Sequence, residues 1–342
     1  MLTDHTYTSD HYIVSYQVRP GEDGIRLDSY LKKLYRKRSR EAIQRAIDEG
    51  SVVIRRQQSP HLHLGKIRAS SQVITGDEIL VTSIRKTEPT VSFDYRILFE
   101  DTDLLIIDKP PNLPVHPAGR YFFNTLLTHL RTHGHRTPLP GAQDHRPEDY
   151  FLVHRIDKET SGILVMARNA RACAALVYQF ATRKTAKRYL AITHGTTQEA
   201  FSNDRGIIRD AKSAIGLKMR AADTAQEPEA QAAFTEFRRL SVHQGGAYSL
   251  VECLPRTGRQ HQIRVHLDDL GHGIVGDKLY GLPEGSSLPF FERGIPTPEA
   301  MARLKLPRHA LHAAGIGFLH PTTGKELTFD SPLPTDLEEF LK

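Results

Sequence analysis

The spacing of apolar residues near the N-terminus predicts two short helices followed by a strand. In residues 24–54, GIRLDSYLKKLYRKRSREAIQRAIDEGSVVI, apolar side chains recur on one helical face and then again on a second. The positions concerned are Leu27, Tyr30, Leu31 and Leu34, then Ile43, Ala46 and Ile47. Ser39 is a favoured N-cap residue for the second helix, Glu41 suits its first turn, and Gly50 ends it.

Basic residues concentrate between these two helices. They are Arg36, Lys37, Arg38 and Arg40. They flank the predicted N-terminus of the second helix, where unpaired backbone N–H groups attract phosphate. Two interpretations stay open: a solvated basic surface, or a clamp on the phosphate backbone of a nucleic acid.

A different pattern begins after a polar stretch. Residues 82–95, TSIRKTEPTVSFDY, contain one proline and show no helical period, so we predict a linker over residues 83–94. The apolar run LLIID, residues 104–108, predicts a buried strand. Lys109-Pro110-Pro111 ends that strand, because proline does not continue a hydrogen-bonded ladder.

The segment FLVHRIDKETSGILVMA, residues 151–167, places an aspartate between basic neighbours at the edge of a predicted strand. Strand alternation would put Arg155 and Asp157 on one face. Ser161-Gly162 predicts a turn, and residues 163–166 predict a buried strand. Asp157 is then either a turn-capping residue or a carboxylate with a chemical role.

Two further segments combine basic and aromatic residues. In RTGRQHQIRVHLDDLGHGIVGDKLYG, residues 256–281, strand alternation would point the Arg264 side chain into a polar space. A buried arginine needs a carboxylate partner, because burying an unpaired charge is expensive. In the predicted strand YLAI, Tyr189 and the nearby Lys187 would face away from the core. Tyr189 is either amphipathic surface or a platform on which a nucleobase stacks.

Length, charge and cysteine content narrow the classes of function. The chain has 342 residues, which favours two domains, and a net charge of +6, which favours a polyanionic partner. It has no apolar run of the roughly 18 residues that a membrane span needs and no signal-peptide pattern, so we expect a cytoplasmic protein. Only Cys173 and Cys253 are present, and the 18 histidines show no metal-binding spacing, so we expect no disulfide framework and no metal.

The N-terminal motifs resemble a small RNA-binding domain of the S-four type. RLDSYLKKLY, SREAIQRAIDEGSVVI and ITGDEILV carry this resemblance over about 60 residues. It implies a domain over residues 23–82, after an extension over residues 1–22, that binds structured RNA with Arg36 to Arg40 facing phosphates.

The remaining motifs resemble the RluA-type pseudouridine synthases over residues 95–342. HRIDKETSG and TGRQHQIRVHLDDLGHGIVGDKLYG are highly specific, and RKTAKRYLAI, EDTDLLIIDKPPNLPVHPAG and the tail RHALHAAGIGFLHPTTGKELTFDSPLP occur in the family's order. The resemblance implies an α+β fold with a mixed, mainly antiparallel sheet. It also implies an enzyme that converts uridines of structured RNA, either rRNA or tRNA, to pseudouridine. Because this reaction is an isomerisation, we expect no cofactor, and we expect a monomer.

The same resemblance implies roles for individual residues. Asp157 would act at the anomeric carbon of a flipped-out uridine, with Arg264 as its basic partner. Tyr189 would pack on the target base, and Arg155 would enter the RNA as that base leaves the stack. Further candidates for RNA contact are Lys187 and Arg259.

The sequence departs from the family pattern at two places. Ile156 replaces the commoner leucine, and residues 281–306 are expected to form a longer, irregular insertion. Two alternative functions stay open: an RNA-binding or ribosome-assembly factor without catalysis, and a glycosidase that uses Asp157 and releases free uracil.

Overall fold

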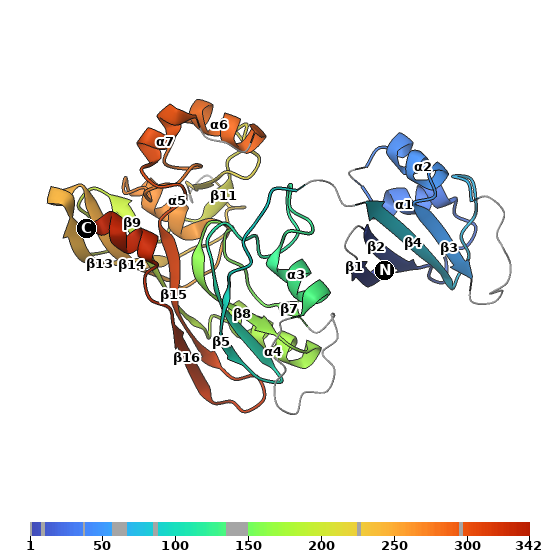
Figure 1. Cartoon of the computed structure of the whole chain (residues 1–342), viewed down its shortest axis with the longest axis horizontal. Helices are drawn as coiled ribbons and strands as arrows, with labels where there is room; N and C mark the ends of the chain where they lie inside the picture. The colour runs from blue at the N-terminus through green and yellow to red at the C-terminus, as the bar shows by residue number, and fades with distance from the viewer. Residues whose placement is uncertain are drawn as a thin grey trace. The chain divides into compact units, whose positions relative to one another are not determined.

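The computed structural model divides the chain into two compact units, Met1–Glu88 and Pro89–Lys342 (Figure 1). It describes residues 2–7, 11–36, 38–56, 67–84, 88–134, 150–223, 227–293 and 297–342. Lys37 of the predicted basic cluster lies outside the described residues.

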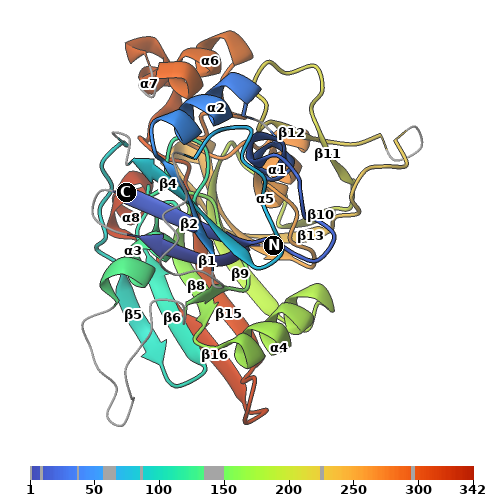
Figure 2. The same ribbon diagram turned by 90° about the vertical axis from the view of Figure 1, so that its right-hand side faces the viewer.

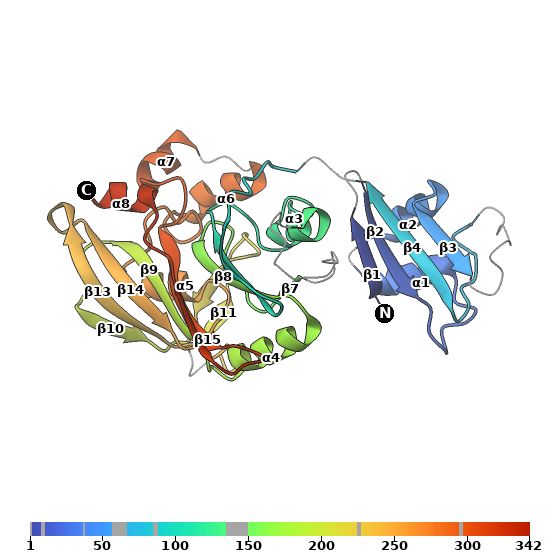
Figure 3. The same cartoon turned by 60° about the horizontal axis from the view of Figure 1, so that its bottom comes forward.

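The N-terminal unit is a four-stranded antiparallel sheet covered by two helices (Figure 3). The strands run in the order β1-β2-β4-β3, and the elements are β1 (Leu2–Tyr7), β2 (His11–Gln17), α1 (Leu27–Leu34), α2 (Arg40–Asp48), β3 (Val52–Arg56) and β4 (Asp77–Ile84). Both predicted helices are present, because their apolar stripes bury Leu27, Tyr30 and Leu31 beside Ile43 and Ile47. The Ser39 hydroxyl accepts a hydrogen bond from the backbone N–H of Ala42, as an N-cap residue does.

The predicted extension over residues 1–22 requires correction. β1 and β2 provide half of the sheet, and β2 pairs with β4 along its whole length, from His11 opposite Ile84 to Gln17 opposite Glu78. The physical reason is burial, since Val14 and Val18 are only 4% and 1% exposed. The N-terminal residues therefore belong to the folded unit.

The C-terminal unit is built on a mixed, mainly antiparallel ten-stranded sheet, so the predicted α+β fold is confirmed (Figure 2). The main strand order is β10-β13-β14-β9-β15-β8-β6-β5; β16 pairs with β15, β7 pairs with β8, and β15 and β8 are parallel. The strands are β5 (Arg96–Glu100), β6 (Leu104–Lys109), β7 (Phe151–Leu152), β8 (Ser161–Ala167), β9 (Ala186–His194), β10 (Ala200–Asn203), β13 (Thr235–His243), β14 (Tyr248–Pro255), β15 (Leu311–Leu319) and β16 (Glu326–Asp330).

Helices and a short hairpin complete this unit. They are α3 (Leu126–His133), α4 (Ala170–Ala181), β11 (Ile207–Arg209), β12 (Met219–Ala221), α5 (Gln262–Asp269), α6 (Glu284–Arg293), α7 (Pro298–Leu304) and α8 (Thr335–Leu341). The expected irregular insertion over residues 281–306 contains α6 and α7 instead (Figure 1). The local cause for α7 is visible, since Thr297 caps its N-terminus and Pro298 occupies the first turn, where no backbone donor is needed.

The sheet is most deeply buried at its centre. Every residue of β8 is buried, and so are most residues of β6. The two apolar runs in the sequence predict this burial. Gly162 in β8 has φ +105°, and a Cβ atom there would lie 2.3 Å from the carbonyl oxygen of Ala313 in β15. Only glycine therefore permits this close approach of β8 to β15. Among the described residues, no helix is long and apolar enough to cross a membrane.

Candidate active site

The segment that carries Asp157 is not a strand, which corrects the sequence prediction. Residues 153–160 form an irregular loop between β7 and β8, so strand alternation does not orient their side chains. Ser161-Gly162 is not a turn either, because these residues start β8. The loop is held at its own end by a hydrogen bond of 3.2 Å from the backbone N–H of Thr160 to the carbonyl oxygen of Asp157.

The segment that carries Arg264 is also not a strand. Gln262–Asp269 forms α5. The short pattern I-R-V-H-L fits a helix as well as a strand, because apolar residues at i and i+4 also share a helical face. Ile263 and Leu267 accordingly point into the core. Gln262 fixes the start of the helix, because its Oε1 accepts hydrogen bonds from the Thr257 hydroxyl at 2.7 Å and from the Arg259 N–H at 3.0 Å.

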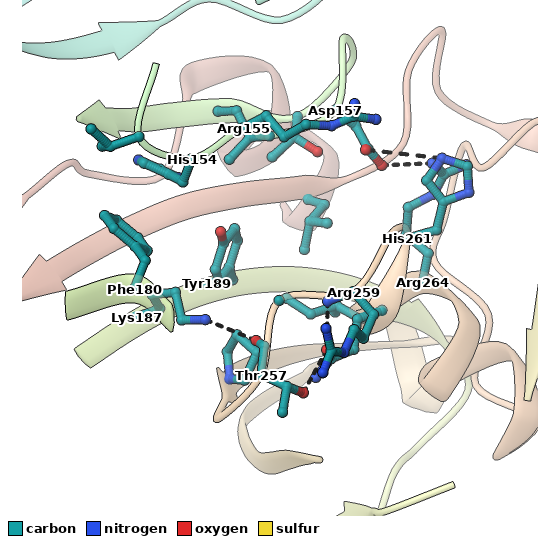
Figure 4. Close-up of a pocket in the computed structure, with 18 of the residues that line it drawn as sticks. His154, Arg155, Asp157, Phe180, Lys187, Tyr189, Thr257, Arg259, His261 and Arg264 are labelled. Atoms are coloured by element: carbon teal, nitrogen blue, oxygen red, sulfur yellow. Dashed lines mark hydrogen bonds and ion pairs between the residues drawn. The ribbon is translucent and has the colours of Figure 1, made fainter. Parts of the chain in front are cut away.

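The structure nevertheless brings the three candidate catalytic side chains into one pocket (Figure 4). Asp157 comes from the loop before β8, Tyr189 from β9 and Arg264 from α5. The pocket has a volume of about 450 Å³. Other predicted RNA-contact residues that line it are Arg155, Lys187 and Arg259.

Arg264 is shared between two carboxylates. Its Nη1 donates to Asp157 Oδ2 at 2.7 Å, while Nε and Nη2 donate to the two oxygens of Asp277 at 2.7 and 2.9 Å. Asp277 is 1% exposed, and its Oδ1 also accepts from the N–H groups of Leu279 and Tyr280. Asp277 therefore fixes the guanidinium plane, and an N–H of Nη1 is aimed at Asp157.

The electrostatic environment keeps Asp157 ionised. Burial would raise its pKa, but the pKa is held well below its usual range by the charges of His261 and Arg264 and by the hydrogen bond from Arg264. At neutral pH the effective contribution is that of Arg264, because burial lowers the pKa of His261 to about 4 and leaves that imidazole uncharged. Asp157 is 23% exposed, so an anionic oxygen reaches the pocket.

Tyr189 forms an aromatic part of the pocket wall. Strand β9 was predicted correctly, with Leu190 and Ile192 in the core and Tyr189 on the pocket side. Burial and the nearby charge of Asp157 raise the pKa of Tyr189, so its phenol stays protonated. Lys187, two residues earlier on the same side, donates to the carbonyl oxygen of Thr257 at 2.8 Å, and burial lowers its pKa to about 8.

The other predicted RNA-contact residues lie at different places. Arg155 is exposed at the pocket, with its Nη1 3.2 Å from His116 Nε2, and Arg259 donates to the carbonyl oxygen of Ala232 at 3.1 Å. The described members of the basic cluster, Arg36, Arg38 and Arg40, are exposed near the start of α2 in the N-terminal unit. Their RNA contacts stay a prediction.

Sequence reasoning missed several residues that build this site. Asp277 and His261 lie inside the motif that contains Arg264, but the incorrect strand assignment hid the position of His261, and no local pattern pointed to Asp277. Lys109 is 1% exposed, and its Nζ donates to the carbonyl oxygens of Pro110 and Lys158, next to Asp157. Burial lowers the pKa of Lys109 to about 7. A lysine at the end of a buried strand was the available signal.

Metal ligands are not grouped in the part of the chain that the structure describes. No set of three or more histidine, cysteine, aspartate or glutamate side chains there is arranged to hold a metal ion. The groups beside the Asp157 carboxylate are the Arg264 guanidinium at 2.7 Å and the neutral His261 imidazole at 4.0 Å.

Comparisons with known proteins agree with this fold. Residues 103–269 match the family model described as RNA pseudouridylate synthase. An uncharacterized RNA pseudouridine synthase from Chlorobaculum parvum is 34% identical over 93% of both chains, and a ribosomal large subunit pseudouridine synthase D from Zymomonas mobilis is 32% identical over 93% of both. The solved structure of human RNA Pseudouridylate Synthase Domain Containing 4 covers 71% of this chain and 90% of its own, at 30% identity and a TM-score of 0.51.

These matches define the class of protein as an isomerase that acts on RNA. The chain belongs to the RluA-type family of RNA pseudouridine synthases.

Proposed function

We propose that this enzyme converts uridines of large-subunit ribosomal RNA to pseudouridine, with Asp157 acting at the sugar of a flipped-out uridine. The observation that carries the proposal is the pair of Asp157 and Arg264, 2.7 Å apart, beside Tyr189 in a pocket of about 450 Å³. The choice of RNA is supported by the name of the relative from Zymomonas mobilis, a ribosomal large subunit pseudouridine synthase.

The proposed reaction begins with extrusion of the target nucleotide. A uridine stacked in an RNA helix does not expose its anomeric carbon, so the base must leave the stack, at a cost of a few kcal/mol. Arg155 is exposed and lines the pocket. In the proposed reaction it occupies the space that the uridine vacates. The aromatic ring of Tyr189 receives the extruded base, because every nucleobase offers a π-face for stacking.

The chemical step is an isomerisation in which atoms balance without a co-reactant. The bond between C1′ and N1 of uracil breaks, and a bond between C1′ and C5 forms; C5 loses a proton and N1 gains one. Positive charge develops on the sugar as the first bond breaks, and the carboxylate of Asp157 stabilises it, as a carboxylate does in glycosidases. Arg264 keeps that carboxylate ionised and oriented.

Substrate capture is proposed to involve the N-terminal unit. Arg36, Arg38 and Arg40 are exposed at the start of α2, where backbone N–H groups favour anions. We assign this surface to the phosphate backbone of structured RNA, in line with its resemblance to S-four-type domains.

The proposal is tested in a strain from which the gene has been deleted. Carbodiimide-dependent primer extension over the large-subunit rRNA should lose at least one stop, which returns when the wild-type chain is supplied but not when Asp157→Asn is supplied. An unchanged set of stops contradicts the function. Loss of stops in tRNA alone contradicts the assigned RNA.

The same strain separates the two alternative functions. A non-catalytic RNA-binding factor would leave every stop in place in the deletion strain. A glycosidase would release free uracil from the RNA, which chromatography of a reaction with the purified enzyme would detect.

A further inference from the structure

His261 is held in an unusual conformation beside the reactive carboxylate. It precedes the first residue of α5 and has φ 56° and ψ 20°, a left-handed backbone that a residue with a side chain adopts only when its surroundings impose it. Its side chain is 11% exposed and lines the pocket, with Nε2 4.0 Å from Asp157 Oδ1 (Figure 4). Asp157 Oδ1 is the oxygen that Arg264 does not contact.

A chain of hydrogen bonds determines which nitrogen of His261 carries hydrogen. The backbone N–H of Met219 donates to the Tyr280 hydroxyl oxygen at 3.2 Å, and that oxygen is 2.9 Å from His261 Nδ1. Because burial raises the pKa of Tyr280, its phenol keeps a hydrogen, and Nδ1 is the acceptor in reach. We assign Nδ1 as the acceptor and Nε2 as the nitrogen that carries the N–H, because the Tyr280 oxygen already accepts from the Met219 N–H.

This imidazole is a neutral donor rather than a cation. Burial and the adjacent charge of Arg264 lower the pKa of His261 to about 4, although Asp157 acts in the opposite direction. The 4.0 Å between Nε2 and Asp157 Oδ1 is too long for a direct hydrogen bond. A hydroxyl oxygen about 2.8 Å from both atoms would fit that gap, accepting from Nε2–H and donating to Oδ1.

We propose that His261 holds the target nucleotide by its ribose 2′-hydroxyl, which bridges His261 Nε2 and Asp157 Oδ1. This inference rests on the proposed function of the pocket. If Asp157 works at C1′, the 2′-hydroxyl is on the neighbouring carbon, and it is a group that both donates and accepts. Since DNA lacks it, His261 is the residue that makes this pocket selective for ribonucleotides at the target position.

The test compares two RNA stem-loops that carry the uridine mapped in the deletion strain. They differ only at the target, which is uridine in one and 2′-deoxyuridine in the other. Single-turnover rates are measured for the wild type, for His261→Phe, which keeps a ring but has no donor, and for Gln260→Ala as an exposed neighbouring control. We expect the wild type and the control to react roughly tenfold or more slowly on the deoxy substrate, the order expected for one lost hydrogen bond.

His261→Phe should be slow on the uridine substrate and show a ribo-to-deoxy rate ratio within about twofold of one, because the contact is already lost. A ratio in His261→Phe equal to that of the wild type would overturn the proposal. Tyr280→Phe provides a second variant that keeps the imidazole but removes the group that fixes its tautomer, and its ratio should lie between the other two. If the wild type fails to modify the uridine substrate, the proposed function fails instead.

Discussion

Arginine occurs in two contrasting environments in this protein. In the N-terminal unit, Arg36, Arg38 and Arg40 are exposed. In the C-terminal unit, Arg264 is 8% exposed and its guanidinium is fixed by two carboxylates. The exposed cluster supplies charge without fixed geometry, which suits a flexible, repeating partner such as a phosphate backbone. The buried arginine supplies fixed geometry, which suits chemistry at one carboxylate.

The largest expected effect comes from removing the carboxylate that the buried arginine orients. Asp157→Asn keeps the shape of the side chain but lacks the negative charge, so single-turnover pseudouridine formation should fall by at least about 10³-fold, as happens when a central catalytic group is lost. RNA affinity, measured by filter binding, should change little. Residual activity within tenfold of the wild type would show that the charge of Asp157 is dispensable.

A smaller loss of rate is expected when Asp277, the second carboxylate partner of Arg264, is replaced and Asp157 is left in place. Asp277→Asn removes the charge that fixes the guanidinium, so the rate should fall by roughly 10²-fold through misplacement of Arg264. The free energy of unfolding should fall by about 3 kcal/mol, because one partner of a buried ion pair is lost. Urea unfolding and single-turnover assays measure the two effects.

Asp330→Asn is the matched control for this prediction. Asp330 pairs with Arg188 at 2.7 Å, but its side chain is 67% exposed. An exposed pair contributes about 0–1 kcal/mol, so this substitution should leave rate and stability nearly unchanged. Equal losses in both variants would mean that burial of the Arg264 pair has no special importance.

The contrast between the two regions also explains what the sequence could predict. The helices of the N-terminal unit follow from local signals, since Ser39 caps α2 and apolar stripes face one core. The pairing of Asp157 with Arg264 joins residues 107 positions apart, and it was expected only from the cost of burying charge and from the family resemblance. Local pattern gave the wrong element for both residues. Asp157 lies in a loop, and the short alternation I-R-V-H-L around Arg264 also fits a helix.

Residues that act through other residues were the hardest to predict. His261 depends on Tyr280 and, beyond it, on a backbone N–H of β12. Lys109 donates to a carbonyl oxygen 49 positions away. Periodicity contains no information about such contacts, because it describes only which face of an element is apolar.

The exposed cluster should affect binding instead of chemistry. A variant with Arg36, Arg38 and Arg40 all replaced by alanine should bind RNA roughly tenfold more weakly, and the slope of log affinity against log salt should fall by about 2 to 3, as expected for three phosphate contacts. The single-turnover rate at saturating enzyme should stay within about twofold of wild type. Filter binding at several salt concentrations measures the slope.

A control variant removes the same charge elsewhere. Arg96, Arg238 and Arg303 are exposed in the C-terminal unit, and their replacement by alanine should change the salt slope less. If both triple variants show the same slope, net charge alone accounts for binding and the cluster has no separate role.

A separate expected effect, on stability and not on catalysis or binding, concerns Lys109, a buried cation without the carboxylate partner that Arg264 has among its hydrogen bonds. Burial lowers the pKa of Lys109 to about 7, from 10.5 in the unfolded chain. Between these pH values the unfolded state binds more protons than the folded state, so Lys109 makes stability rise with pH by at most about 1.4 kcal/mol per pH unit. Below about pH 7 both states are protonated, so the pH dependence vanishes and the cost of burying the charge is fully present.

Lys109→Met should remove that dependence. From pH 7 to pH 9 the unfolding free energy of the wild type should therefore rise relative to that of Lys109→Met. Urea unfolding at each pH measures both values. Replacement of the exposed Lys325 by methionine should leave the slope of unfolding free energy against pH as it is in the wild type. Parallel curves for wild type and Lys109→Met would show that Lys109 stays charged in the folded protein, and that its hydrogen bonds to two carbonyl oxygens stabilise the cation as well as a carboxylate would.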